Sequence, residues 1–269
     1  METVIISTAQ FSHLQYYKAG QGPAVVLLHG FPEDGCLWNN VVPGLADSFT
    51  VLVPDIPGSG ASKLDKPDVS IEDLSHCINA ILDQEHIEEA VVAGHSMGGY
   101  IALAFAAHNA NRLKGLSMIH STATADTEEK KQTRLKSIEL IRKGGKEAFV
   151  KGMIPNLFSA DFRERHPTVV KHQIERGIML SSESMISFYN AMINRPDRTN
   201  ILKDAAFPVQ WVIGKEDQVV PVDSSLQQSC LANVNFVSLY ANCGHMSMLE
   251  APERLTNDLR EFLVFCYNR

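Results

Sequence analysis

The sequence predicts an α/β fold, and three observations support this prediction. Short, continuously apolar segments recur along the chain, and several of them run directly into Gly or Pro. Helical patterns lie between these segments, and one long stretch has helical patterns but no strand pattern. Continuous apolar strands suit a parallel sheet covered on both faces, and strands that alternate with helices are typical of α/β proteins. We therefore expect a mostly parallel, eight-stranded sheet flanked by helices, with an inserted helical segment.

The expected strands follow from short apolar runs. The first two form an antiparallel edge, at residues 3–6 and 14–17. The six core strands are expected at residues 25–28, 51–53, 90–93, 115–119, 209–213 and 235–239. The helices that flank the sheet are expected at residues 71–84, 99–110, 224–231 and 252–267.

A helical insertion interrupts the alternation of strands and helices. Between residues 122 and 205 we expect only helices, at residues 127–143, 146–153, 167–176 and 182–194. This divides the chain into a core, residues 1–121 and 206–269, and a helical cap, residues 122–205. The Lys and Arg residues from Lys130 to Lys143 are expected to form a solvated helix face.

The overall composition excludes several classes of function. The chain has 269 residues and a formal net charge of -7, with no basic stripe of the kind that binds nucleic acid. Its five cysteines are widely spaced and include no C-x-x-C pair, so free thiols and a cytoplasmic location are expected. No apolar run reaches the roughly 18 residues of a membrane helix. No H-E-x-x-H, Walker or G-x-G-x-x-G motif is present, so we expect no metal and no cofactor.

A serine surrounded by glycines is the strongest sign of chemistry. Residues 94–98 read Gly-His-Ser-Met-Gly, a G-x-S-x-G pattern between a predicted strand and a predicted helix. Such a nucleophile elbow strains the backbone at the serine, and glycines remove the collisions that the tight turn would cause. Ser96 is the predicted nucleophile.

A serine hydroxyl needs a base, and the base needs a carboxylate to orient it. His245 follows the last predicted strand, so it should lie at the same sheet edge as Ser96. Asp217 and Glu216 both follow the strand at residues 209–213. We favour Asp217 as the orienting acid, with Glu216 as the rival, because the chain turns back after Asp217.

A developing oxyanion needs hydrogen-bond donors. The backbone amides of Phe31 and Met97 are the expected pair, since Phe31 follows the first core strand and Met97 follows the nucleophile. Gly30 allows the loop a close approach. His29 is expected to be structural, with its ring hydrogen-bonded to the backbone.

Together these motifs resemble the capped α/β-hydrolases. The matching segments are LLHGFP (27–32) with Trp38, DIPGSGAS (55–62), GHSMGG (94–99), GKEDQVVP (214–221) and CGHMSMLEAPE (243–253). They occur in the family's order, which implies its fold and its Ser–Asp–His triad. Ser96 argues against the epoxide hydrolases and haloalkane dehalogenases, which use aspartate there. Met97 departs from the perhydrolases and haloperoxidases, which usually have threonine.

The resemblance also ranks the remaining activities. Carbon–carbon bond hydrolases share the S-M-G-G run but usually carry tryptophan where Met246 stands. Small carboxylesterases and enol-lactonases fit best, and the segment from Arg195 to Asp197 is similar to theirs. We therefore expect hydrolysis of small, largely apolar esters or lactones. A carbon–carbon bond hydrolase of vinylogous diketones and a signal receptor with slow turnover remain the alternatives, and a homodimer is left open.

The cap should roof the substrate pocket, and its apolar residues suggest the lining. The expected substrate-binding residues are Ile154, Leu157, Phe158, Met185, Phe188, Tyr189, Met192 and Met246.

Overall fold

The computed structural model describes all 269 residues and is built on one eight-stranded sheet. The strand order is β1-β2-β4-β3-β5-β6-β7-β8. β1 and β2 are paired antiparallel, as are β2 and β4, and the other pairs are parallel. The strands are β1 (Glu2–Ile6), β2 (Leu14–Ala19), β3 (Ala24–Leu28), β4 (Thr50–Pro54), β5 (Ala90–His95), β6 (Leu113–Ile119), β7 (Val209–Gly214) and β8 (Asn235–Tyr240).

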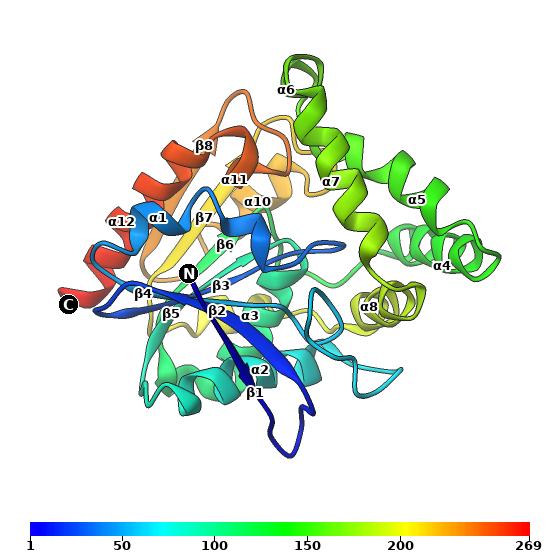
Figure 1. Cartoon of the computed structure of the whole chain (residues 1–269). Helices are drawn as coiled ribbons and strands as arrows, with labels where there is room; N and C mark the ends of the chain where they lie inside the picture. Colours follow the sequence, from blue (N-terminus) through cyan, green and yellow to red (C-terminus); the bar gives the residue numbers. More distant parts are fainter.

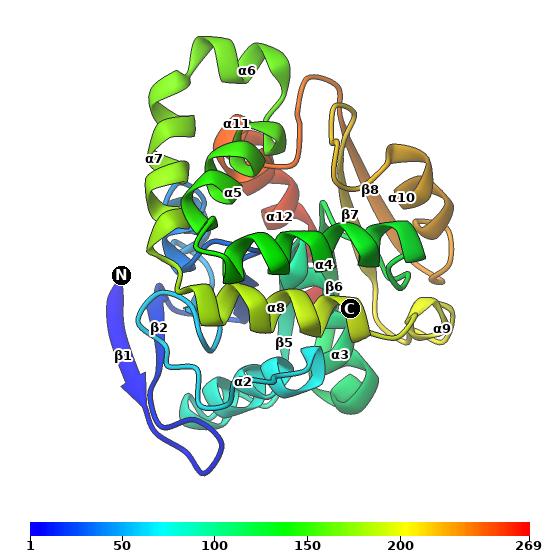
Figure 2. The same cartoon turned by 90° about the vertical axis from the view of Figure 1, so that its right-hand side faces the viewer.

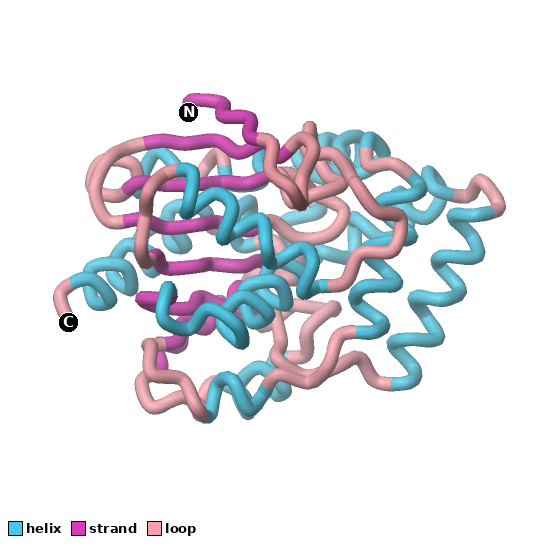
Figure 3. Tube along the Cα trace, turned by 90° about the horizontal axis from the view of Figure 1, so that it is seen from below, coloured by secondary structure: helices cyan, strands magenta, loops and turns pink.

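Helices cover both faces of the sheet (Figures 1 and 3). On one face lie α2 (Ile71–Gln84) and α3 (Met97–Asn109), and on the other lie α1 (Val42–Leu45) and α12 (Pro252–Tyr267). The start of α2 is set by a capping box, in which the side chains of Ser70 and Asp73 each accept from the other residue's backbone amide. All of the predicted strands are present, and the sheet confirms the predicted fold class.

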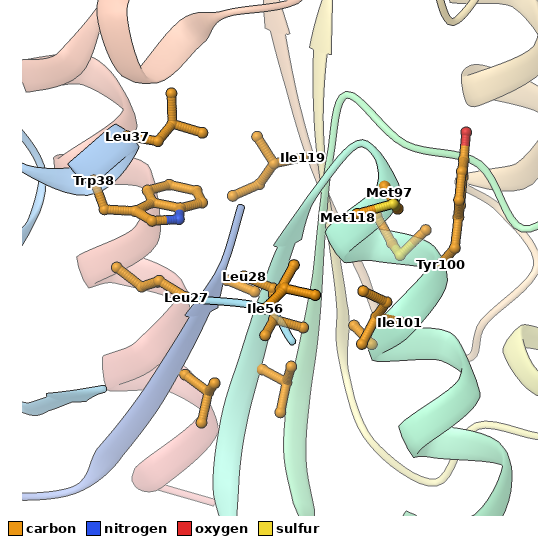
Figure 4. Close-up of a cluster of buried hydrophobic side chains, with 14 of the residues drawn as sticks. Leu27, Leu28, Leu37, Trp38, Ile56, Met97, Tyr100, Ile101, Met118 and Ile119 are labelled. Carbon is orange, nitrogen blue, oxygen red and sulfur yellow. The ribbon is translucent and has the colours of Figure 1, made fainter. Parts of the chain in front are cut away.

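The central strands and α3 form the core beneath the candidate site. β3 and β5 are buried along their whole length, as continuous apolar strands in a doubly covered sheet should be. The first ten residues of α3 are also buried, so this helix is apolar on every side. Figure 4 shows this buried cluster near the strand ends, including Trp38, Leu28 and Met118, and it gives the site a rigid base.

A layer of helices lies between β6 and β7 in the sequence and beyond one end of the sheet (Figures 1 and 2). We call residues 122–205 the helical insertion. No strand occurs in it, as the sequence predicts. Its helices are α4 (Glu128–Arg142), α5 (Lys146–Met153), η3 (Ile154–Leu157), α6 (Ala160–Arg165), α7 (Pro167–Met179), α8 (Ser182–Asn194) and α9 (Thr199–Lys203).

Several short helical elements were not predicted, because a single turn leaves too little periodicity in the sequence. Besides α1, η3, α6 and α9, these are η1 (Gly35–Trp38), η2 (Ala110–Arg112) and α11 (Ser247–Glu250). The helix predicted at residues 224–231 is α10 (Val222–Gln228), which begins two residues earlier.

A cluster of ion pairs centred on Asp126 joins the two ends of the helical insertion. This cluster corrects the prediction made for the basic residues of α4. Asp126 is buried, and its carboxylate lies 2.6 Å from Nε of Arg134 and 2.8 Å from Nη1 of Arg195. The Arg195 guanidinium also lies 3.8 Å from the ring centroid of Tyr100 on α3. The prediction of a solvated face from Lys130 to Lys143 is therefore wrong for Arg134, whose charge is matched inside the protein.

No helix in the structure is both long enough and apolar enough to span a bilayer.

Candidate active site

The turn from β5 to α3 places Ser96 at a strained position. Ser96 has φ 52° and ψ -114°, and it is the only residue between Ala90 and Tyr100 that is not buried. A Cβ on Gly94 would lie 2.3 Å from the carbonyl carbon of Gly98. A Cβ on Gly98 would lie 2.6 Å from the carbonyl oxygens of Leu28 and His29, at the end of β3. The glycines are thus required for the close backbone approach that lifts Ser96 above the sheet edge.

Hydrogen bonds to its amide and its carbonyl hold the strained serine in place. Its amide donates to the carbonyl of Ile119 at 3.0 Å. Its carbonyl accepts from Oγ of Ser121 at 2.8 Å. Both partners belong to β6 or to the loop that follows it, so the adjacent strand fixes the position of Ser96.

Asp217 and His245 are brought together at the same edge. Nδ1 of His245 lies 2.7 Å from Oδ2 of Asp217, and both side chains are 2% exposed. The other carboxylate oxygen, Oδ1, accepts from the amides of Val219 at 2.7 Å and Val220 at 2.9 Å. Burial alone would raise the pKa of the Asp217 carboxyl, but His245 and the other donors hold it far below its usual range. Asp217 is therefore a carboxylate at neutral pH.

The structure distinguishes the two candidate acids. Glu216 is half-buried, and its amide donates to the carbonyl of Cys243 at 3.0 Å. Its side chain makes no hydrogen bond to His245, whereas that of Asp217 does. The geometry thus favours Asp217, as expected from the sequence.

The loop that carries His245 is fixed to the helical insertion. The His245 amide donates to the carbonyl of Leu157 at 2.7 Å. The carboxylate of Glu250 accepts from the amides of Gly244 at 3.0 Å, Met246 at 3.2 Å and Ser159 at 3.0 Å. The loop of His245 and the turn after η3 are therefore joined by hydrogen bonds into one unit.

His95, the residue before the predicted nucleophile, joins three loops of the site. Its Nε2 lies 2.9 Å from the carbonyl oxygen of His245, and its Nδ1 lies 3.2 Å from Oε2 of Glu33. Glu33 also accepts from the amide of Gly30 at 3.1 Å. His95 and Glu33 were not predicted from the sequence. They connect the elbow to the loop of His245 and to the loop that contains Phe31, one of the two predicted oxyanion donors.

Both predicted oxyanion donors belong to segments that lie next to Ser96. A Cβ on Gly30 would lie 3.1 Å from Cβ of Ser96, so the loop containing Phe31 comes close to the serine. The amide of Phe31 makes no hydrogen bond, and the Phe31–Pro32 peptide bond is cis. Met97 is the first residue of α3, so its amide has no acceptor within the helix. Both donors are available to an anion.

The prediction for His29 is confirmed. Its Nδ1 lies 2.8 Å from the carbonyl oxygen of Gly30, and its Nε2 accepts from the amide of Ile56 at 3.0 Å.

Comparison with known proteins decides the family. Residues 23–252 match the model of the α/β hydrolase fold. The chain belongs to the α/β-hydrolase fold family. It is 28% identical to an esterase from Thermogutta terrifontis, with a TM-score of 0.92 and 99% of each chain covered.

Two further proteins similar to this α/β-hydrolase family member carry the name of a lactonase or a hydrolase. An enol-lactonase from Burkholderia xenovorans LB400 has a TM-score of 0.89 at 23% identity, over 97% of this chain and 100% of its own. The 2-hydroxy-6-oxo-6-(2'-aminophenyl)hexa-2,4-dienoic acid hydrolase of Metapseudomonas resinovorans is 25% identical over 93% of this chain and 87% of its own.

The predicted substrate-binding residues of this family member are all buried, with relative exposures of 6% or less. Tyr189 stacks on the ring of Phe31, with the ring centroids 4.6 Å apart. Burial raises the pKa of Tyr189 to about 12, so its phenol is neutral. The remaining members of the set are Ile154, Leu157, Phe158, Met185, Phe188, Met192 and Met246.

A groove of about 370 Å³ runs along the boundary between the core and the helical insertion. Pro32 and Glu33 from the oxyanion loop line one side, and α7 and the start of α8 line the other. The ion pair between Asp34 and Arg176, at 2.5 Å, joins the two sides. A second hollow, of about 710 Å³, lies between the β1–β2 loop and α2 and contains none of the predicted site residues.

A second histidine, His120, approaches the predicted acid and was also not predicted. It directly follows β6 and is buried, and its Nδ1 lies 3.3 Å from Oδ2 of Asp217. His120, Asp217 and His245 could together suggest a metal site, because each has a ring nitrogen or carboxylate oxygen within 4.8 Å of those of the other two. However, the 2.7 Å between Asp217 and His245 is a hydrogen-bond distance. Two ligands of a tetrahedral zinc ion, each bound at about 2.0–2.1 Å, would lie about 3.3 Å apart.

Proposed function

We propose that this protein is a serine hydrolase that cleaves small, largely apolar carboxylic esters or lactones through an acyl-serine intermediate. His245 takes the proton of Ser96 as the serine oxygen attacks the carbonyl carbon. The amides of Phe31 and Met97 stabilise the oxyanion, and Asp217 orients and stabilises the imidazolium. His245 then protonates the leaving alcohol, and the same residue activates the water that releases the acid.

The observation that carries this proposal is the pairing of a carboxylate and an imidazole beside a nucleophile elbow. The bond from His245 to Asp217 leaves Nε2 of His245 without a protein partner. The contact between His95 and the His245 carbonyl keeps this loop next to the residue before Ser96. The likeness to the Thermogutta terrifontis esterase supports ester hydrolysis, since it covers both chains nearly completely.

We further propose that the helical insertion acts as a cap over the site. The hydrogen bond between Leu157 and His245 and the stacking of Tyr189 on Phe31 support this role. An apolar roof favours an apolar acyl or alcohol group and excludes bulk water from the acyl-enzyme.

A carbon–carbon bond hydrolase is a second candidate, because a relative named a dienoic acid hydrolase shares 25% identity over nearly the whole chain. The same serine, base and oxyanion donors would then act on a vinylogous diketone. A signal receptor with slow turnover is the third candidate, and turnover number distinguishes it from an enzyme.

The decisive experiment measures turnover on a panel of p-nitrophenyl esters, lactones, thioesters and vinylogous diketones. Ser96→Ala should abolish turnover and labelling by a fluorophosphonate probe, while Ser182→Ala, an exposed serine of the helical insertion, should retain both. Multiple turnovers on esters or lactones support the proposal. A single burst would instead indicate a receptor, and full activity of Ser96→Ala would refute the nucleophile.

A further inference from the structure

His120 is a buried histidine whose chemistry the proposed mechanism does not use. It lies directly after β6, its amide donates to the carbonyl of Val212 at 2.9 Å, and its backbone has φ 48°. Neither ring nitrogen makes a well-aligned hydrogen bond to any protein atom. The polar atom within reach of the ring is Oδ2 of Asp217, 3.3 Å from Nδ1. Leaving a buried polar group otherwise unpaired is costly, so this contact needs an explanation.

The ring of His120 is a neutral donor in this environment. Burial lowers the pKa of His120 below its ordinary value, although Asp217 opposes the shift. A neutral imidazole carries one N–H, and Asp217 is an acceptor in its ionised form. With the proton on Nδ1, the N–H of His120 lies beside the same oxygen that accepts from His245, at an Nδ1–Oδ2 distance of 3.3 Å but without the alignment of a full hydrogen bond.

We propose that His120 is a positioning residue that shares the Asp217 carboxylate with His245 and thereby sets how readily the His245 imidazole accepts a proton. This inference rests on the proposed function, since it assigns His245 as the base. The carboxylate stabilises the imidazolium of His245 through its negative charge. A second donor on the same oxygen disperses part of that charge and weakens the stabilisation. His120 therefore favours the neutral form of His245, which is the form that can take the proton of Ser96.

Other titratable groups also surround this pair, and a substitution at His120 removes none of them. The ring of His95 lies 6.1 Å from that of His120 and 4.8 Å from that of His245, and it is paired with Glu33. The carboxylate of Glu250 holds the loop of His245. The Cys243 thiol is buried, which raises its pKa and keeps it uncharged.

The chain offers a matched set of variants at this position. His120→Asn places an amide nitrogen where Nδ1 lies, and asparagine tolerates positive φ. His120→Leu fills similar space with no donor. His120→Gln keeps an amide but displaces it toward the position of Nε2, away from Asp217.

The test is the titration midpoint of His245, followed by NMR of histidine-labelled protein, with the acid limb of kcat/KM as a second readout. In His120→Leu and His120→Gln both should move upward by about half to one pH unit, because the negative charge of Asp217 then acts on His245 alone. In His120→Asn both should stay within about a quarter of a unit of the wild type.

Two results would overturn the proposal. One is an unchanged midpoint in a folded variant that lacks the donor, and the other is an equal shift in His120→Asn, which would show that only packing matters. If His120→Leu does not fold, the comparison of Asn with Gln decides. The NMR titration needs no turnover, so failure of the ester panel would not be confused with failure of this inference.

Discussion

Replacing Asp217 with asparagine tests the predicted triad most directly, because the structure dictates how the new amide must sit. Two backbone amides, those of Val219 and Val220, point at Oδ1. The asparagine oxygen has to occupy that position, so its NH2 group faces Nδ1 of His245. Two donors cannot share one bond, and His245 is forced to carry its proton on Nε2. It can then no longer accept the proton of Ser96.

We expect Asp217→Asn to lower kcat by about 10⁴-fold, the scale seen when an orienting carboxylate is lost. This equals about 5.5 kcal/mol of transition-state stabilisation at 1.36 kcal/mol per tenfold change. The assay is initial-rate hydrolysis of a p-nitrophenyl ester, with active sites counted by a fluorophosphonate. Glu216→Gln is the matched control and should change kcat less than threefold, roughly the scale of a neutral surface substitution. A loss under tenfold in Asp217→Asn, or a large loss in Glu216→Gln, would refute the assignment.

Three further predictions concern stability, each measured by urea unfolding. Gly98→Ala should lower the free energy of unfolding by about 1–3 kcal/mol, because its Cβ would lie 2.6 Å from backbone oxygens. Gly152→Ala, whose Cβ would have nothing within 4 Å, should raise the free energy of unfolding by up to about 1 kcal/mol. Equal effects of the two substitutions would contradict the packing argument. Asp126→Ala should lower the free energy of unfolding by about 3–5 kcal/mol, since it leaves the buried Arg195 and the half-buried Arg134 without their carboxylate. A loss below about 1 kcal/mol would be inconsistent with a buried ion cluster. The lowered pKa of His120 means that its contribution to stability is complete above about pH 6.5 and declines as pH falls, by up to about 1.4 kcal/mol per unit. His120→Asn should flatten this slope below about pH 6.5. An unchanged slope would show that the decline has another source.

Long, periodic elements could be predicted from the sequence with accurate bounds. α5 and α8 begin and end at the predicted residues, and the capping box at Ser70 marks the start of α2. The pairing of Asp217 with His245 could be predicted for a different reason. Side chains that follow parallel strands meet at one sheet edge, so two loops far apart in the chain could be placed together.

The same rule could have identified His120, which directly follows β6, but no motif draws attention to it. Arg134 was misassigned because helical periodicity shows which side of a helix a residue occupies and not which charges face it. Its partner Asp126 lies in the preceding loop, and Arg195 lies at the far end of the insertion. The hydrogen bonds made by His95 and Glu33 depend on how three separate loops lie next to one another in space. A single sequence carries no local pattern that predicts this arrangement.

The hydrogen bond from the His245 amide to Leu157 has a consequence for how new specificities can be built on this scaffold. A chimera that exchanges the whole segment 122–205 would replace the turn that holds the Leu157 carbonyl against the His245 amide. An exchange limited to α4, α5, α7 and α8 would retain this native turn. Grafts that keep residues 154–159 native should therefore yield working enzymes more often than grafts made at the outer junctions. In evolution, that short turn should be inherited together with the loop it supports, while the surrounding helices diverge.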